Sequence, residues 1–405
     1  MTLSLVHSTS AFQKSRRQSI DDVAAAFCGY FQGAGYETVE PEPLIPRNDK
    51  SVLFSNATIT PLKDRLLADE RPETGWVIQQ PCLRLQNFSD YPNPDFSPEY
   101  MSFFHMVGVF APDLSTEYAE HLLKALEASG VSPEQLELRG CYRDADMMAI
   151  MRSVMPEETA IETCGRFEGY FDWKYDMEGY RGRGFHIMIK QPEGPALSIG
   201  QVVEISENNH VVGYEFGFGC ETFLSRCLGT DSIFTQGLFV DSCGKASDNI
   251  HRQYYDTLTS AIAMSGSGVT PGKGGRASVL RKALRNCAVF EQVYGCQTVT
   301  NEEIQSLSEA VSKSLPDGSF TPSAFNELLD SARERLANEI SRFHDYVHQR
   351  SLSEQRGDTT PEYSRAKITG YARKLHVPEL VLHEALNALS NEIEPSSPIE
   401  SSLSS

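Results

Sequence analysis

Apolar residues first recur at helical spacing close to the amino terminus. Two aspartates follow Ser19, and two glycines, Gly33 and Gly35, close the segment. A serine suits the free N–H groups at the start of a helix, and acidic residues in the first turn suit the positive end of its dipole. We therefore predict a helix from about Ser19 to Gly33, and its apolar face comprises Ile20, Val23, Ala24, Phe27 and Phe31.

Two apolar segments further along the chain bracket a polar one that is rich in proline. The apolar segments are TGWVIQQPCLRLQ (74–86) and YMSFFHMVGVFA (100–111), and NFSDYPNPDFSPE lies between them. Short apolar segments of this kind are typical of strands, and a loop held between strands often carries ligand contacts. We predict two strands joined by a long loop.

The pattern changes type in the rest of the chain. From Thr116 to about Leu138 it is helical, and from 160 to 225 short apolar alternations are interrupted by glycine. From about Asp248 onward, long helical patterns follow one another. Runs of strands followed by runs of helices indicate an α+β protein, in which an antiparallel sheet precedes an all-α domain.

The composition narrows the classes of function. A chain of 405 residues, 40% of them hydrophobic, can fill two or three domain cores. Its 55 acidic and 36 basic residues give a net charge of -19, which repels nucleic-acid backbones at long range, so only a local basic patch could hold RNA. No apolar run has the roughly 20 residues that span a bilayer, and the nine cysteines form no CxxC pair. We expect a cytoplasmic protein with reduced thiols and no membrane segment.

One basic segment departs from the acidic average. Between residues 273 and 285, five cations occur without an acidic residue. On a helix, Arg281 and Arg285 would share one face at i,i+4 spacing. The segment is either a solvated helix face or a phosphate-binding surface. Its cations are Lys273, Arg276, Arg281, Lys282 and Arg285.

Four segments resemble, in order and spacing, those of the alanyl-tRNA synthetase family. They are LIPRNDKSVLFSNATITPLKD (44–64), CLRLQN with SFFHMVGVF (82–110), GYEFGFGCET (213–222) and GVTPGKGGRASVLRKALR (268–285). The resemblance extends over about residues 17–390. It implies a class II synthetase fold, an antiparallel sheet flanked by helices, on which ATP and an amino acid condense to an aminoacyl-adenylate.

The same resemblance divides the chain into units. We expect a flexible extension at the amino terminus, although its serine-rich, acid-free composition also weakly resembles a transit peptide. The expected units are the extension (1–16), a catalytic domain (17–245), a helical acceptor-binding domain (246–392) and a disordered tail (393–405).

The resemblance also implies roles for single residues. Arg84 matches the motif-two arginine that contacts the α-phosphate of ATP. Phe103 and Phe104 alternate along one strand, so one can stack on adenine while the other packs in the core. Glu215 stands where the family places an aspartate that holds the substrate ammonium. Further positions that match the family's amino-acid site are Gly217, Gly219, Gln201 and Asp172.

The sequence departs from the family in motif three, where Glu221 and Thr222 replace a Glu-Arg pair. Glu221 remains an ATP-binding candidate, but a threonine cannot neutralise a leaving pyrophosphate, and losing such a cation costs on the order of 10³-fold in rate. Arg226, one helical turn further on, could substitute in part and joins Arg84 as a catalytic candidate. His105 replaces the glutamate of the family's Phe-Phe-Glu triplet, and the motif-two loop lacks the family's lysine.

The implied ligands are ATP with Mg²⁺, a small amino acid such as alanine, and a tRNA acceptor stem bound by the basic segment. Two alternatives stay open: a paralogue in specialised metabolism that loads an amino acid onto a small molecule or carrier protein, and a non-catalytic relative that acts by binding. His344 and His348 have a zinc-binding spacing, but no cysteine follows Cys296 and no HExxH occurs, so we expect no zinc and no protein-bound metal site.

Overall fold

The computed structural model describes residues 20–164, 171–175, 177–230, 232–239, 248–315 and 320–391. Ser19, the predicted extension (1–16), the predicted tail (393–405) and the predicted domain boundary at 245 lie outside the described residues. Within the described ranges, no helix combines the length and the apolar character that crossing a membrane requires.

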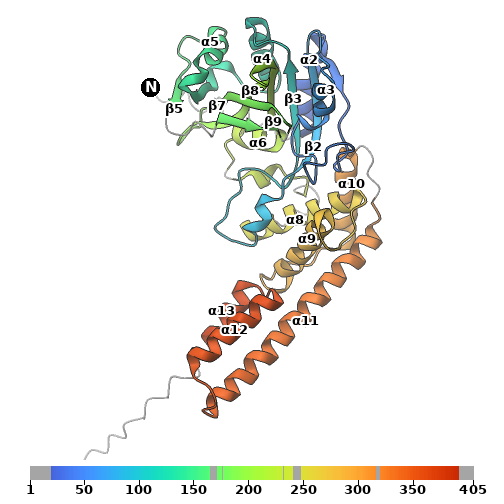
Figure 1. Ribbon diagram of the computed structural model, residues 1–405, viewed down its shortest axis with the longest axis vertical. Helices are drawn as coiled ribbons and strands as arrows, with labels where there is room; N and C mark the ends of the chain where they lie inside the picture. Colours follow the sequence, from blue (N-terminus) through green and yellow to red (C-terminus); the bar gives the residue numbers. More distant parts are fainter. Residues whose placement is uncertain are drawn as a thin grey trace, which may run out of the picture.

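A mixed sheet of nine strands forms the first part of the described chain (Figure 1). Its order is β1-β2-β3-β9-β8-β7-β4-β5, and β6 pairs with β7 outside this path. The predicted fold class is confirmed: the pairs from β2 across to β4 are antiparallel, and only the outer pairs β1–β2 and β4–β5 are parallel. The strands are β1 (Glu37–Val39), β2 (Trp76–Leu83), β3 (Phe103–Ala111), β4 (Leu136–Cys141), β5 (Ile161–Cys164), β6 (Asp172–Lys174), β7 (Tyr180–Ile189), β8 (Leu197–Glu207) and β9 (His210–Gly219).

Helices cover one face of this sheet. The predicted first helix is confirmed as α2, and its Phe27 contacts Phe216 and Phe218 of β9 in a core that α4, α5 and α6 also share. The helices of this domain are α2 (Ile20–Gly33), α3 (Lys63–Leu67), α4 (Thr116–Ala128), α5 (Ala145–Ser153) and α6 (Cys220–Cys227). Short 3-10 helices are η1 (Thr60–Leu62), η2 (Gln86–Ser89), η3 (Pro133–Gln135), η4 (Tyr142–Asp144) and η6 (Ile233–Gln236).

Two stretches differ from the predicted pattern. Helix α4 ends at Ala128 because Gly130 turns the chain with a φ of 97°, and the apolar residues up to Leu138 belong to β4 instead. Residues 220–227 form a helix, α6, rather than the last part of the strand region. The pattern also does not predict α5 or α12, both of which the structure contains.

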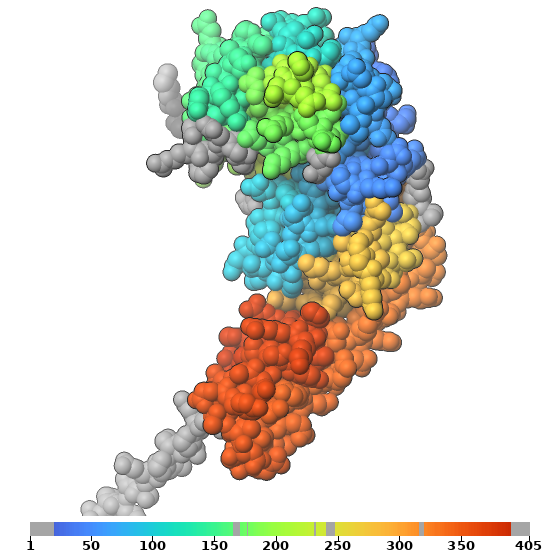
Figure 2. Space-filling view, in the orientation of Figure 1, coloured from blue at the N-terminus to red at the C-terminus, as the bar shows by residue number. Residues whose placement is uncertain are grey.

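The second part of the chain is an elongated helical arm, along which α11 extends away from the sheet (Figures 1 and 2). The predicted helical character of this part is confirmed. Its helices are α8 (Asn249–Gly266), α9 (Gly275–Gln292), α10 (Asn301–Ser314), α11 (Pro322–Gln355), α12 (Pro361–Leu375) and α13 (Glu379–Asn391).

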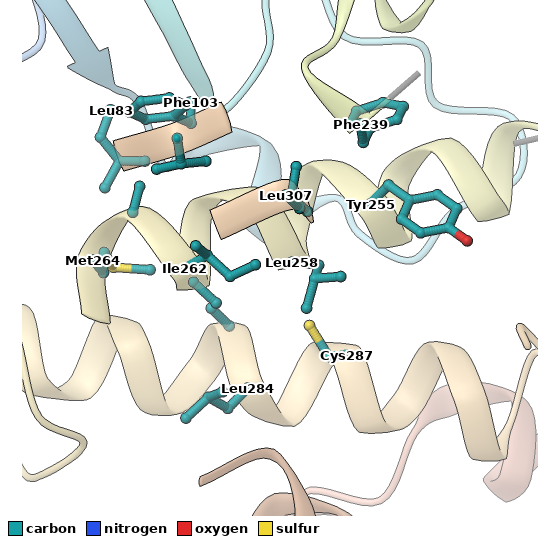
Figure 3. Packing of buried hydrophobic residues seen from close by; sticks show 14 of the residues in the cluster. Leu83, Phe103, Phe239, Tyr255, Leu258, Ile262, Met264, Leu284, Cys287 and Leu307 are labelled. Atoms are coloured by element: carbon teal, nitrogen blue, oxygen red, sulfur yellow. The ribbon is translucent and has the colours of Figure 1, made fainter. Parts of the chain in front are cut away.

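A single apolar core joins the arm to the sheet. Leu83 of β2 and Phe103 of β3 belong to the same buried cluster as Leu258 of α8, Leu284 of α9 and Leu307 of α10 (Figure 3). Such a shared core fixes one end of the arm against the ends of β2 and β3, because separating the two parts would expose apolar surface to water.

Candidate functional site

A cavity of about 190 Å³ lies on the sheet face opposite the α2–α4–α5–α6 layer. Alternate residues of β3, β8 and β9 form its floor, and residues 52–59 and β6 form its walls. Gly217 lets the wall approach the floor, because a Cβ there would lie 3.0 Å from Thr58 Oγ1. The predicted site residues that line this cavity are Arg84, Gln201, Glu215 and Gly217.

Arg84 directly follows β2 and stands beside the cavity. Its Nε donates to the carbonyl of Asn56 at 3.0 Å, and its Nη2 lies 3.6 Å from the sulfur of Met106. The guanidinium carbon lies 5.0 Å from the ring centroid of Phe104 and 5.5 Å from that of Tyr100. These described contacts include no carboxylate, so they hold the side chain in place without neutralising its charge.

The two phenylalanines of β3 are both 2% exposed and belong to one apolar cluster, but they point to opposite faces of the strand. Phe104 lies under Arg84 and close to Gly219, where a Cβ would come within 3.3 Å of the Phe104 ring. Phe103 packs in the core between sheet and arm (Figure 3). The alternation predicted from the strand is therefore present, and Phe104 is the ring on the side of the cavity.

Glu215 reaches the cavity from β9. Its Oε1 accepts a hydrogen bond of 2.6 Å from the Thr58 hydroxyl. Burial raises the pKa of Glu215 to about 7, although the hydrogen bond from Thr58 lowers it. A cation bound in the cavity would favour the ionised carboxylate, so this group suits a ligand that carries an ammonium.

Aromatic side chains adjoin Gln201. The Oε1 of Gln201 accepts from the indole N–H of Trp173 at 3.3 Å, and the Trp173 ring lies 6.1 Å from that of His186. Burial lowers the pKa of His186 to about 4, and Arg139 and Arg226 act in the same direction. His186 is therefore uncharged at neutral pH.

Asp172 is not brought into the cavity. Its carboxylate lies 2.5 Å from Arg143 Nη2 and lines a different cavity of about 400 Å³ between β6, β7 and the β8–β9 turn. Trp173, Lys174 and Tyr175 line the first cavity, whereas Asp172 lines only the other one. The contacts of Asp172 give no support to its predicted role at the amino acid.

Glu221 also lies away from the cavity. Both of its oxygens accept from the backbone N–H of His105, at 3.0 and 3.1 Å, and its Oε1 lies 2.8 Å from His105 Nδ1. The side chain is 2% exposed, in a pair that connects α6 to β3. Because the side chain is buried and both oxygens accept from His105, the contacts of Glu221 join α6 to β3, and its predicted contact with ATP has no geometric support.

Thr222 and Arg226 share a face of α6 but have different neighbours. The Thr222 hydroxyl donates to the carbonyl of Glu99 at 3.4 Å and lies near Gly219, on the side of Phe104. Arg226 donates to the carbonyl of Ser198 and does not line the cavity. The structure thus places the threonine, and not the arginine, beside the phenylalanine ring, and substitution by Arg226 stays a prediction.

The basic segment is divided among different partners. Arg276 donates to the carbonyl of Leu53, while Arg285 pairs with Glu339 at 2.9 Å and donates to the carbonyl of His376 at 2.5 Å. These two cations therefore join elements of the protein to one another. The exposed cations of the segment are Lys273, Arg281 and Lys282.

Sequence reasoning missed several residues of the cavity. Lys63 is buried beside it and pairs with Asp49 at 2.7 Å; hydrogen bonds from Lys63 and Ser51 outweigh burial and lower the pKa of Asp49. Lys63 and Thr58 both lie within the segment 44–64 that carries the family resemblance, so their position was a usable signal. Among the described residues, no three His, Cys, Asp or Glu side chains are grouped to hold a metal ion.

Comparison with known families gives this geometry a context. Residues 22–177, which include β2, β3 and the 52–59 wall, match the family model described as tRNA synthetases class II (A). This part of the chain is therefore similar to class II tRNA synthetases. The matched residues include Arg84, both phenylalanines and Thr58, while Glu215 and Gly217 lie beyond them.

The sheet domain and the arm together are similar to alanine–tRNA ligases. The chain is 24% identical to that of Rhizobium johnstonii over 365 residues, which cover 80% of this chain and 41% of the relative. It is 26% identical to that of Acidithiobacillus ferridurans over 379 residues, covering 82% and 42%. The resemblance to alanyl-tRNA synthetases is confirmed, and the chain spans less than half the length of these curated relatives.

Solved structures with some likeness to this chain are also synthetases. One is PylSc, a pyrrolysyl tRNA synthetase of Desulfitobacterium hafniense, with a TM-score of 0.34, 13% identity, and coverage of 57% of this chain and 79% of the other. Another is the asparaginyl-tRNA synthetase of Pyrococcus horikoshii, with a TM-score of 0.33, 10% identity, and coverage of 54% and 66%.

Proposed function

We propose that this chain is an ATP-dependent ligase that activates an amino acid as its aminoacyl-adenylate. The observation that carries the proposal is that a carboxylate, Glu215, and a guanidinium, Arg84, line one cavity of about 190 Å³, and that Arg84 lies over the ring of Phe104. An amino acid needs the first group for its ammonium, and ATP needs the second for its α-phosphate.

The reaction assigns one task to each of these groups. The substrate carboxylate attacks the α-phosphorus of ATP, the bond to the β-phosphate breaks, and pyrophosphate leaves. Arg84 stabilises the negative charge that grows on the α-phosphate oxygens, and the buried ring of Phe104 supports its guanidinium. Glu215 fixes the ammonium, so that the carboxylate of the amino acid points toward the phosphate.

The proposed reaction uses ATP together with Mg²⁺. Mg²⁺ commonly binds through substrate phosphates together with few protein groups, so we place it on the phosphates of ATP. The substrate would be a small amino acid, because the cavity is narrow and bounded by Trp173 and Val203. Alanine is the first candidate. Amino-acid-dependent exchange of labelled pyrophosphate into ATP tests activation directly.

The acceptor in this proposal is the 3′ end of a tRNA. The exposed cations of α9, Arg281 and Lys282, lie on the arm that packs against the ends of β2 and β3. Phosphate contacts of this kind position an RNA backbone and make binding sensitive to salt.

Exchanging these cations for acidic residues separates amino-acid activation from the transfer of the aminoacyl group to tRNA. The double variant Arg281→Glu with Lys282→Glu should lower tRNA charging by more than about tenfold while leaving pyrophosphate exchange unchanged, because repulsion acts on the RNA backbone only. The matched control is Arg335→Glu with Arg356→Glu, which makes the same change of charge at exposed positions of the arm outside this segment. Equal charging by both double variants would remove α9 as the acceptor surface.

A second candidate acceptor is a small molecule or a carrier protein. The observation in its favour is that Arg276 and Arg285 contact protein groups, which leaves fewer cations for an acceptor stem. In that case the chain would exchange pyrophosphate but charge no tRNA, and the adenylate would be consumed by an amine, hydroxyl or thiol acceptor.

Thr222 offers a gain-of-function test. Thr222→Arg would restore a cation beside Phe104 and Gly219, and the rate of pyrophosphate exchange at saturating ATP should rise about tenfold or more, because the leaving pyrophosphate would be neutralised. Thr222→Gln is the control of similar length without charge. If both variants had the same rate, the missing cation would not limit the reaction.

A further inference from the structure

One face of α8 carries three polar side chains that all bind the loop between β2 and β3. Asn249, Gln253 and Asp256 are spaced four and three residues apart, so they lie on one face of the helix. Gln253 and Asp256 are fully buried. The loop they bind is the polar, proline-rich segment 87–102 that follows Arg84.

The first two side chains hold the middle of the loop. The amide of Gln253 accepts from the backbone N–H of Asn93 at 3.0 Å and donates to the carbonyls of Asn93 and Phe96 at 2.6 and 3.0 Å. Asn249 donates to the carbonyls of Pro94 and Phe96, both at 2.8 Å. Side-chain amides thus replace the backbone partners that a regular element would supply.

Asp256 holds the end of the loop where β3 begins. Its carboxylate accepts from the backbone N–H of Ser102 at 2.9 Å, from the Ser102 hydroxyl at 2.6 Å and from the Tyr91 hydroxyl at 3.0 Å. Burial raises the pKa of Asp256 to about 6, and the charge of Glu221 acts in the same direction, while the bonds from Ser102 and Tyr91 lower it. Above that pH the carboxylate is ionised, and its described partners are all donors.

Asn249, Gln253 and Asp256 together form a clamp on the loop. The loop residues that this clamp fixes lie against the proposed nucleotide site. Ser102 precedes Phe103 and Phe104 directly, and Tyr100 is one of the two rings on which Arg84 stacks. Figure 2 shows the segment coloured cyan, which includes this loop, between the sheet domain and the arm. A shift of the loop would therefore displace the ring of Tyr100, the start of β3 and the guanidinium of Arg84 together.

We propose that Asp256 and Gln253 are positioning residues for ATP: they fix the 87–102 loop from the arm, and through it Arg84 and Phe104. This inference rests on the proposed function for the identity of the ligand, but the clamp itself is independent of it. The clamp makes the positions of Arg84 and Phe104 depend on the arm. Glu215 and Thr58, by contrast, contact neither α8 nor the loop in their described hydrogen bonds.

The test compares Asp256→Ala, Asp256→Asn and Gln253→Leu in the full chain. Ser260→Ala is the matched control, because Ser260 is buried on the same helix and its hydroxyl has no hydrogen-bond partner among the described residues. Hydrogen exchange of the loop amides measures the clamp, calorimetry with ATP measures the nucleotide site, and the fluorescence of Trp173 in a Trp76→Phe background measures amino-acid binding.

We expect faster exchange of the Ser102 and Asn93 amides and about tenfold weaker ATP binding, with amino-acid binding changed less than twofold, since small displacements of positioning groups cost one to two orders of magnitude. Asp256→Asn should recover part of the loss, because its amide oxygen still accepts from the Ser102 N–H. Unchanged ATP affinity, or a parallel loss of both ligands, would overturn the inference. If the unaltered chain bound no ATP, the proposed function would fail, and the exchange data alone would decide whether α8 holds the loop.

Discussion

Replacement of Arg84 by alanine is expected to lower amino-acid-dependent pyrophosphate exchange by about 10³-fold, the scale of loss when an arginine on a transferring phosphoryl group is removed. Its described contacts include a carbonyl, a thioether and two aromatic rings, but no carboxylate, so its charge is available for the α-phosphate. The measurement is the steady-state rate of exchange at saturating amino acid and ATP.

Arg84→Lys is the informative companion variant. It keeps the charge but loses the planar group that stacks on Phe104 and donates to the Asn56 carbonyl. Its rate should lie between those of the original chain and Arg84→Ala. An Arg84→Ala chain that kept its thermal midpoint and more than a tenth of the exchange rate would show that this arginine does not act on the phosphate.

Replacement of Glu215 by glutamine is expected to raise the KM for the amino acid by about 100-fold, near 3 kcal/mol, because the substrate ammonium loses its charged partner. The KM for ATP should change little, since Glu215 and Arg84 meet different parts of the reactants. Glu215→Asp, which keeps the charge on a shorter side chain, should cost much less.

The pH profile gives this prediction a second readout. The carboxyl binds an ammonium only when ionised, and burial raises its pKa to about 7. The kcat/KM for the amino acid should therefore rise with pH up to about 7 and then level off, whereas Glu215→Gln should lack this rise. The raised pKa also means that ionisation of Glu215 costs stability as pH rises from 4.5 to 7, so the glutamine variant should be no less stable than the original chain at pH 8. If kcat/KM of Glu215→Gln rose with pH in the same way, the titrating group would not be Glu215.

Much of this site follows from the sequence because strands have a fixed period. The apolar segments around 74–86 and 100–111 predict β2 and β3, and alternation along β3 separates Phe103 from Phe104. The motif spacing also singles out Arg84, Glu215 and Gly217, and the structure brings these three residues to one cavity. These positions depend mainly on local periodicity and on chain order, both of which a sequence displays.

The remaining residues depend on partners that a sequence pattern does not reveal. Asp172 lies on a three-residue strand whose pattern does not predict its neighbours, and in the structure its carboxylate contacts Arg143 instead of the cavity. Glu221 looks available for a ligand until His105, 116 residues earlier, occupies both of its oxygens. The clamp by Gln253 and Asp256 joins segments more than 150 residues apart, so neither its helix nor its loop predicts it alone.

The most direct test of amino-acid activation is a screen of the full chain for exchange of labelled pyrophosphate into ATP with each common amino acid. The proposal predicts exchange that depends on one or a few small amino acids, with alanine first among them, and that is lost in Arg84→Ala. Correctly folded protein that showed no amino-acid-dependent exchange with any of them would contradict the account and leave only a binding function.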